Sequence, residues 1–314
     1  MKNPSSTTSP PSTSKEAAQP SSAAELKPPR FVVGKPNVLD RELFQKRVTE
    51  ILDAGIHTND GAFVKQLEYL VQEKLAVPHC IAMNNATAAL ELLLQSLNKT
   101  GEVIVPSFTF VASVHSIVRS NLQPVFCDVD KRGLIDCDEV ERLINKSTIC
   151  ILPVNVYGYV CDTDRLQAIS ERYKIPVIYD SAHALGVKRN GVAQGSLGHA
   201  EVFSLHATKF ISGFEGGLVT TKSDEVAKQM RSARNFGFAG YDAVDSIGTN
   251  AKLSEIHAAM ALTNLERLND IVAHNREIFK TYKQLLHSSL RLIEPVEGEE
   301  PNYQYVPVIC PPEK

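Results

Sequence analysis

From Phe31 onward, short apolar runs alternate with stretches of helical periodicity along the chain. Because a strand followed by a crossover helix returns to the same sheet in parallel, this alternation is typical of an α/β fold with a mostly parallel sheet. Expected helices include residues 86–97, 138–145 and 162–173, and the last two open with acidic residues suited to helix amino termini. The expected strands are residues 79–84, 102–106, 123–129, 148–156, 175–180 and 200–205.

The two ends of the chain differ from this alternating part. Residues 1–30 consist mainly of Ser, Pro, Thr and Ala, which bury too little apolar surface to offset chain entropy, so a disordered tail is expected. A targeting segment is the alternative, but the stretch has one Arg and no apolar core. After about Leu253 the pattern is helical, and residues 302–310 form an expected strand. We therefore expect a large domain over residues 31–270 and the start of a small carboxyl-terminal domain over residues 271–314.

Composition argues against several functional classes. The net charge of -3 leaves no basic excess to neutralise a phosphate backbone, which argues against a nucleic-acid partner. No apolar run reaches the ~20 residues of a membrane span, and the amino terminus lacks a secretory signal, so a cytoplasmic protein without a membrane partner is expected. The six cysteines contain no C-x-x-C pair and the nine histidines have no metal-binding spacing. Neither a disulfide nor a bound metal is expected.

Two segments bring reactive side chains to the ends of strands. Asp180 ends the expected strand 175–180, at the sheet edge where α/β proteins bind ligands, and a carboxylate there can pair with a pyridinium or cap a helix. The segment AEVFSLHATKFISGFEGGLVTT places Lys209 among small and hydroxyl residues after a strand. Such surroundings desolvate an amine, lower its pKa and favour imine formation, whereas a Lys without them is a solvated surface group. Ser204 of the same segment is placed to bond a phosphate.

A third candidate site is the start of the expected helix 86–97. The segment HCIAMNNATAALELLLQSL runs from strand to helix, and a helix amino terminus offers free N–H groups to a phosphate, with the Thr87 hydroxyl as a further donor. A simple cap by Asn85 or Thr87 is the alternative. An enzyme that uses pyridoxal phosphate (PLP) needs these three features together. It holds an aldehyde as an imine on Lys, keeps the pyridine nitrogen protonated and grips a phosphate.

Matching segments along most of the chain carry a family resemblance. They are NNATAAL, VIVPSFTFVAS, PVFCDVD, LPVNVYG, PVIYDSAHALG, GSLGHAEVFSLHATK, EGGLVTT and GTNAKLSEIHAAMALTNLERL. With these segments the chain resembles the DegT/DnrJ/EryC1/StrS aminotransferases, fold-type I PLP enzymes that act mostly on nucleotide-linked keto sugars. The resemblance runs from about Leu39 to the carboxyl terminus. It implies a large domain with a mixed, mostly parallel seven-stranded sheet and helices on both faces, followed by a small α/β domain.

The resemblance also implies roles for individual residues around the PLP ring. Lys209 would bind the cofactor covalently, and Asp180 would pair with the pyridine nitrogen. Phe110 of the segment PSFTF would lie over the ring. His183, at a position that the family fills with Gln or His, would bond the phenolic oxygen. Without the resemblance, Phe110 is read as a core aromatic and His183 as a satisfied turn residue.

The phosphate contacts implied by the resemblance come from two subunits. Ala86, Thr87 and Ser204 would hold the phosphate within one chain, and Asn250 would reach it from the neighbouring subunit of a homodimer. Read alone, Asn250 is a loop cap.

Some positions depart from the usual family pattern. Ala86 stands where many members have Gly in the phosphate turn, and Lys252 replaces an Arg often found after the loop Asn. Residues 213–217 read GFEGG where many members read TGEGG, which resembles the branch acting on dTDP-linked 4-keto-6-deoxyhexoses. Family members also continue past the strand 302–310. We therefore expect an incomplete, apparently truncated small domain and an open sugar pocket, with cofactor binding and dimerisation retained.

The resemblance implies ping-pong transamination from an amino-acid donor, L-glutamate, to a nucleotide-linked keto sugar such as a dTDP-4-keto-6-deoxyhexose. A PLP-dependent sugar 3-dehydratase of the same fold is one alternative, but it has His in place of the Schiff-base Lys, so Lys209 argues against it. A catalytically impaired PLP-binding or regulatory protein of the same fold is a second. A nicotinamide-dependent Rossmann enzyme is a third, and no G-x-G-x-x-G follows an expected strand.

Overall fold

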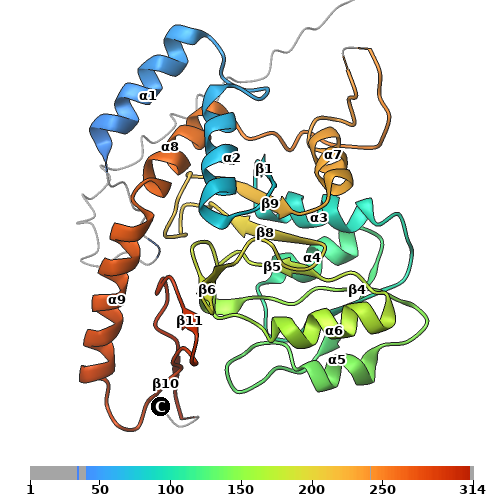
Figure 1. The fold of residues 1–314 in the computed structure, drawn as a ribbon, viewed down its shortest axis with the longest axis vertical. Helices are drawn as coiled ribbons and strands as arrows, with labels where there is room; N and C mark the ends of the chain where they lie inside the picture. Colours follow the sequence, from blue (N-terminus) through green and yellow to red (C-terminus); the bar gives the residue numbers. More distant parts are fainter. Residues whose placement is uncertain (1–33, 35–39, 241, 312–314) are drawn as a thin grey trace, which may run out of the picture. The chain divides into compact units, whose positions relative to one another are not determined.

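The computed structural model describes Gly34, residues 40–240 and residues 242–311. The tail expected over residues 1–30 lies outside the described residues. Within the described part, each strand expected between residues 79 and 205 contains an observed strand (Figure 1). These strands are β1 (His79–Met83), β2 (Glu102–Pro106), β3 (Gln123–Cys127), β4 (Thr148–Ile151), β5 (Ile178–Asp180) and β8 (Ala200–Ser204). A further strand, β9 (Gly217–Thr221), follows the turn at residues 213–216.

The strands form two hydrogen-bonded sheets. One has the order β1-β9-β8-β5, in which β9 is antiparallel to both neighbours and β5 is parallel to β8. The other has the order β3-β2-β4 and is wholly parallel. Isolated parallel bridges join Ile151 to Val177 and Val154 to Asp180, and so connect the β4 segment with the β5 segment. The carboxyl ends of β5 and β8 therefore lie side by side, and Asp180 and Ser204 end these strands.

Helices cover both faces of the strands, which makes the chain an α/β protein. Successive strand residues point to opposite faces, and on β1 the side chains of Ile81 and Met83 join one core while those of Cys80 and Ala82 join another. The first core contains α3, α4 and α7, the second contains α2 and α8, and a third under α5 and α6 covers the β2 to β5 strands. The helices are α1 (Arg41–Ala54), α2 (Ala62–Leu75), α3 (Ala86–Ser96), α4 (Val111–Arg119), α5 (Cys137–Leu143), α6 (Thr163–Tyr173), α7 (Asp224–Ala233), α8 (Glu255–Leu265) and α9 (Leu268–Leu285).

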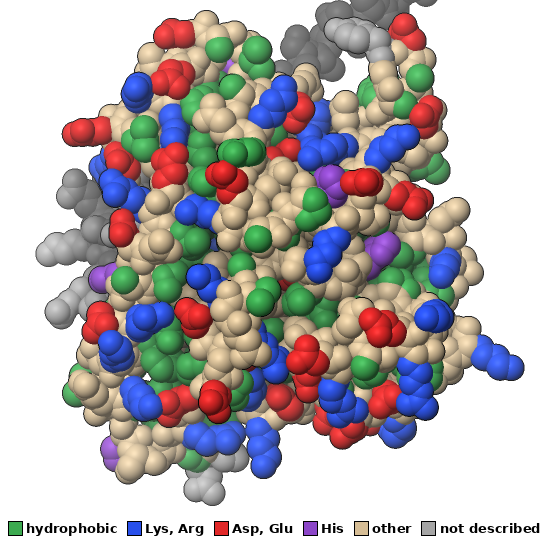
Figure 2. All heavy atoms as spheres, in the orientation of Figure 1, with side chains coloured by type: hydrophobic (Ala, Val, Ile, Leu, Met, Phe, Trp, Pro, Cys, Tyr) green, Lys and Arg blue, Asp and Glu red, His purple; other side chains and the backbone are tan. Residues whose placement is uncertain are grey.

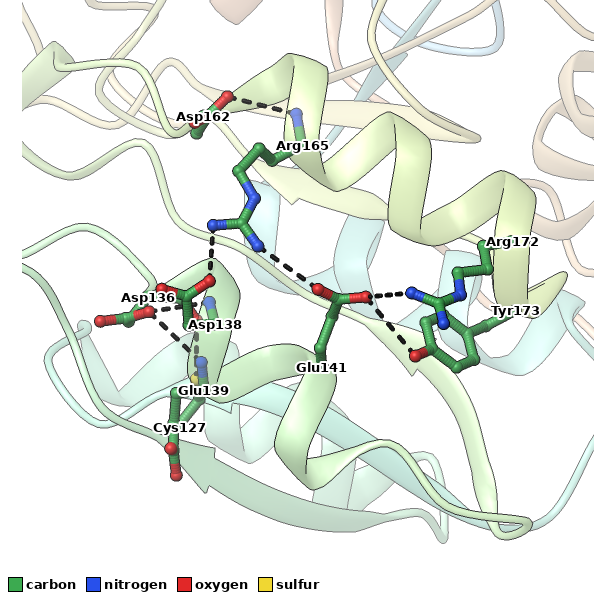
Figure 3. Close-up of polar contacts among 9 residues, drawn as sticks. All are labelled: Cys127, Asp136, Asp138, Glu139, Glu141, Asp162, Arg165, Arg172 and Tyr173. Atoms are coloured by element: carbon green, nitrogen blue, oxygen red, sulfur yellow. Dashed lines mark hydrogen bonds and ion pairs between the residues drawn. The ribbon is translucent and has the colours of Figure 1, made fainter.

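Charged side chains connect α5 and α6 at the surface (Figure 3). Arg165 of α6 donates hydrogen bonds to Asp138 at 2.6 Å and to Glu141 at 3.3 Å, and Glu141 also accepts one from Arg172 at 3.1 Å. The side chain of Asp138 is 83% exposed and that of Arg172 is 70% exposed. Each such pair contributes about 1 kcal/mol or less in water. The apolar core beneath these helices therefore holds them more strongly than the ion pairs do.

Acidic residues cap both of these helices, at the expected Asp162 for α6 but at Asp136, two residues before the expected start at Asp138, for α5. The side chain of Asp136 accepts hydrogen bonds from the N–H groups of Asp138 and Glu139 at the start of α5. The side chain of Asp162 accepts one from the N–H of Arg165 at the start of α6. These caps satisfy N–H groups that have no partner inside the helix, and each is worth about 1 kcal/mol.

The strand expected over residues 302–310 is mostly wrong. Only β12 (Val308–Ile309) is a strand, and it pairs with β10 (Arg291–Leu292). Tyr303 has a φ of 53°, in the left-handed region that interrupts extended backbone, which is why no strand forms over the first part of the segment. Before this segment, β11 (Glu299–Glu300) pairs with β6 (Lys188–Arg189) of a small sheet that also contains β7 (Val192–Ala193).

The surface and the helices give two further findings. Figure 2 shows acidic and basic side chains interspersed over one face of the molecule. In the part of the chain that is described, no helix has the length and apolar character needed to cross a bilayer.

Candidate active site

Asp180 ends β5 as a buried carboxylate that is 5% exposed. Its Oδ2 accepts a hydrogen bond from Ser113 Oγ at 2.7 Å, and its Oδ1 accepts one from the Ala182 N–H at 3.1 Å. Burial raises the pKa of Asp180, whereas these two hydrogen bonds and the charge of Lys209 lower it. Among the described residues Asp180 has no ion-pair partner. Two donors thus orient a carboxylate that is available to a protonated ring nitrogen.

Ser113 is a site residue that the sequence analysis missed. It lies fully buried on α4, and its Oγ is also 2.8 Å from Thr109 Oγ1. The two hydroxyl residues are four positions apart in the segment SFTFVAS, a spacing that brings them to one side of a helix start. That spacing was the available signal, but nothing local indicates that it points at Asp180.

Lys209 lies half-buried in the loop that follows β8, and its N–H donates to the carbonyl of His206 at 2.8 Å. Burial lowers the pKa of its amine, against the negative charge of Asp180, which raises it. The two groups are therefore close enough to influence each other, although they come from different strands. A lowered pKa leaves more of the amine uncharged near neutral pH, the form that attacks a carbonyl.

His183 lies in the turn after β5 and is held by groups from distant segments. The N–H of Tyr157 donates to His183 Nδ1 at 3.1 Å, and Nε2 is 3.3 Å from the hydroxyl of Tyr305. Burial and the charge of Lys209 lower the pKa of His183 to about 3, so the ring is neutral at physiological pH. With Nδ1 accepting from a backbone amide, the single ring proton is on Nε2.

The start of α3 has the features of an anion site. Asn85 is the amino-terminal cap, because its side chain accepts a hydrogen bond from the Ala88 N–H at 2.7 Å. The helix cap considered from the sequence is therefore confirmed for Asn85. The N–H groups of Ala86 and Thr87 have no hydrogen-bond acceptor among the residues that the structure describes. Gly217 packs against this turn so closely that a Cβ there would lie 2.5 Å from the backbone carbon of Asn85.

Ser204 is brought next to the start of α3 by strand pairing. It is paired with Gly217 across β8 and β9, and Gly217 is the residue that contacts the α3 turn. Its Oγ accepts a weak hydrogen bond from the His206 N–H at 3.3 Å, which leaves its hydroxyl proton free to donate. The three phosphate residues expected within one chain, Ala86, Thr87 and Ser204, therefore lie around one point.

Phe110 and Asn250 are exposed, whereas the site residues described above are buried or half-buried. Phe110 is 74% exposed at the start of α4, so its interpretation as a core aromatic is wrong. Asn250 is exposed, its Oδ1 accepts from Lys252 Nζ at 2.8 Å, and its carbonyl accepts from Asn84 Nδ2 at 3.3 Å. Asn84 directly precedes the cap of α3.

A segment after β11 completes one side of the site, where the sequence pattern had predicted only a strand of the small domain. Asn302 is fully buried, and its Nδ2 donates to the carbonyl oxygens of His183 at 2.8 Å and Leu185 at 3.1 Å. Gln304 Nε2 donates to the carbonyl of Thr208, next to Lys209, at 3.1 Å. Side-chain anchors thus fix residues 302–305 against both turns that carry reactive groups.

Comparisons with known proteins identify a matching family. The DegT/DnrJ/EryC1/StrS aminotransferase family matches residues 39–314. The chain belongs to this family. PLP is the cofactor of the family, so the chain is a PLP-dependent sugar aminotransferase by descent.

Relatives and solved structures of the family cover most of the chain. A dTDP-4-amino-4,6-dideoxy-D-glucose transaminase of Shigella dysenteriae is 34% identical over 287 residues, 90% of this chain and 78% of that protein. A GDP-perosamine synthase of Caulobacter vibrioides is 34% identical, covering 82% of this chain and 70% of that protein. The structure of DesI with its TDP-sugar product has a TM-score of 0.85 and 37% identity, covering 89% of this chain and 72% of DesI. Spr1654 of Streptococcus pneumoniae in its PLP form has a TM-score of 0.82 and 27% identity, covering 88% of this chain and 77% of that one.

Beneath the site of this aminotransferase, a buried acid supports the turn after Asp180. Glu201 Oε2 accepts from Ser181 Oγ at 2.8 Å, and its Oε1 accepts from the N–H groups of Gly195 at 2.6 Å and Leu197 at 2.8 Å. Ser181 Oγ in turn accepts from Asn155 Nδ2 at 2.9 Å. Burial raises the pKa of Glu201 to about 7, although the three hydrogen bonds favour its charged form.

This raised pKa predicts a pH dependence of stability. In the unfolded chain the pKa of Glu201 is near the ordinary glutamate value of 4.5, and in the folded chain it is about 7. Between these values the folded state binds more protons, so the free energy of unfolding should fall as pH rises from about 4.5 to about 7, by about 3 kcal/mol in all. The variant Glu201→Gln should lack this slope in urea unfolding. The exposed control Glu297→Gln should keep it, and an unchanged slope in Glu201→Gln would contradict the assignment.

Proposed function

We propose that this aminotransferase transfers an amino group from L-glutamate to a nucleotide-linked keto sugar such as a dTDP-4-keto-6-deoxyhexose. The observation that carries the proposal is the convergence of Lys209 and the buried, donor-held Asp180, whose charges shift each other's pKa. The substrate class is supported by relatives named for dTDP-linked and GDP-linked sugars and by DesI with its TDP-sugar.

The residues present fit PLP. Asp180 is a buried carboxylate without a cationic partner in the described residues, which suits the pyridine N–H. The free N–H groups of Ala86 and Thr87 and the hydroxyl of Ser204 suit a phosphate. Gly217 packs against this turn, and the close contact leaves no room for a side chain at position 217. When bound, the cofactor supplies an aldehyde for the lysine amine and a protonated ring that accepts electrons.

The side chains then have separate tasks. Lys209 holds the cofactor covalently and, once released, accepts and returns a proton on Nζ, because its lowered pKa brings that exchange toward neutral pH. Asp180 keeps the ring nitrogen protonated, and Ser113 and Ala182 prevent the carboxylate from rotating away. We assign neutral His183, with its single ring proton on Nε2, to the side of the cofactor ring that carries the phenolic oxygen.

The remaining roles complete the proposed assembly. We assign Phe110 to one face of the ring, in keeping with its exposed position at the start of α4. We assign Asn250 to the phosphate of the partner subunit in a homodimer. The loop before Asn250 carries exposed apolar side chains, with Val244 62% and Ile247 95% exposed, as an interface requires. The two sheets joined by bridges would act as one seven-stranded sheet, with a large domain over residues 31–270 and a small domain from residue 271.

A half-reaction tests the proposal. Purified protein loaded with PLP should change to the absorbance of pyridoxamine phosphate on addition of L-glutamate. Addition of a dTDP-4-keto-6-deoxyhexose should then restore the first spectrum, because the amino group leaves with the sugar. Glucose, which has no free keto group on a nucleotide-linked ring, is the control acceptor and should restore nothing. An unchanged spectrum after L-glutamate would reject the donor, and an unchanged spectrum after every keto sugar would reject the acceptor class.

A further inference from the structure

The orientation of His183 is fixed by a backbone amide. Tyr157 has a φ of 58°, a left-handed conformation that is uncommon for a side chain of its size, and in this conformation its N–H donates to His183 Nδ1 at 3.1 Å. A backbone N–H is only a donor, so Nδ1 is an acceptor. The neutral ring must therefore carry its proton on Nε2.

This tautomer sets the direction of the next hydrogen bond. Nε2 of His183 is 3.3 Å from the hydroxyl oxygen of Tyr305, and the centroids of the two rings are 4.7 Å apart. With the proton on Nε2, His183 donates and the Tyr305 oxygen accepts. The hydroxyl proton of Tyr305 must then point elsewhere, and no described residue accepts it. Tyr305 thus presents a donor.

The position of that donor is set by the segment that carries it. Asn302 bonds the carbonyl of His183, and Gln304 bonds the carbonyl of Thr208 beside Lys209. The ring of Tyr305 also packs edge-on against Tyr157, with centroids 5.7 Å apart. The hydroxyl is therefore held between the turn of His183 and the loop of Lys209, on a half-buried side chain.

We propose that Tyr305 is a binding residue whose hydroxyl donates a hydrogen bond to an oxygen of the ligand held between His183 and Lys209. That acceptor is either the ring oxygen of the cofactor or the keto oxygen of the sugar. This proposal rests on the proposed function, because the proposed function supplies the identity of the ligand. The Tyr157 amide fixes the His183 proton on Nε2, and this makes the Tyr305 hydroxyl a donor. The ligand atom next to this hydroxyl must therefore be a hydrogen-bond acceptor.

The variant Tyr305→Phe removes the hydroxyl and keeps the ring. Its matched control is Tyr303→Phe in the same segment, whose ring packs against Phe279 at 5.2 Å and lies 5.5 Å from the guanidinium of Arg276. If the acceptor is the cofactor oxygen, the pH midpoint of the absorbance change of bound PLP, measured without substrate, should rise by about one unit, because a donor to the charged oxygen is lost. If the acceptor is the keto oxygen, that midpoint should stay and kcat/KM for the keto sugar should fall about tenfold or more.

A second measurement needs no ligand. The 15N chemical shifts of His183 in the ligand-free protein should show an unprotonated Nδ1 and a protonated Nε2. A protonated Nδ1 overturns the proposal, and so does a Tyr305→Phe variant that matches wild type and Tyr303→Phe in both the midpoint and kcat/KM. In either case a wild-type protein that carries PLP on Lys209 leaves the proposed function intact. A wild-type protein that does not acquire PLP overturns both.

Discussion

Replacing Lys209 by Ala should reduce transamination by about a thousandfold or more. The variant loses both the covalent attachment of the cofactor and the amine that exchanges a proton, and general acid–base catalysis alone contributes about 10²–10⁴-fold. The amine of Lys209 is half-buried, its pKa is lowered by burial, and it interacts electrostatically with Asp180. The half-reaction with L-glutamate measures the loss.

Chemical trapping separates this role from a structural one. Borohydride reduction of the wild-type holoenzyme followed by peptide mass analysis should find the pyridoxyl group on Lys209. Lys228→Ala, a change at an exposed position on α7, should keep both label and activity. A label on another lysine, or none on wild type, would refute the assignment.

Replacing Asp180 by Asn should lower transamination by about 10²–10⁴-fold while the protein stays folded. The exchange removes the charge that keeps the ring nitrogen protonated, and breaking a buried ion pair or an electrostatic contact of this kind costs about 3–5 kcal/mol. Stability should be equal or higher, because burial disfavours the charged form of Asp180 in the ligand-free protein. Ser113 can accept from the new amide, since its own proton can turn to Thr109 Oγ1, which lies 2.8 Å away.

A smaller change at the same carboxylate is the control for this prediction. Ser113→Ala removes one donor to Oδ2 and leaves the charge, so activity should fall only about tenfold. Turnover is measured in the half-reaction and folding by urea unfolding. If Asp180→Asn turns over almost as fast as wild type, Asp180 is only a cap for the turn at Ala182, as its hydrogen bond to that N–H would also allow.

The sequence was sufficient to predict the elements with strong local signals. The strand ending at Asp180, the strand before Lys209 and the helix starting at Ala86 were all expected from apolar runs and helix-start residues, and each is present. The sheet brings these ends to one edge because β5 and β8 are parallel neighbours, and β1, which is antiparallel to β9 as β8 is, runs in the same direction as both. The α/β class therefore follows from the residue pattern, and the family and the cofactor follow from the resemblance of the segments that contain these residues.

Tertiary structure alone decided the contacts that orient these groups. Ser113 under Asp180, the Tyr157 amide on His183 and Asn302 on the His183 carbonyl each join segments far apart in the chain. The strand expected over 302–310 failed for the same reason, since a left-handed Tyr303 and side-chain anchors replace the ladder. Periodicity reports which face of an element is buried, whereas a hydrogen bond between distant segments depends on where the folded backbone places two particular atoms.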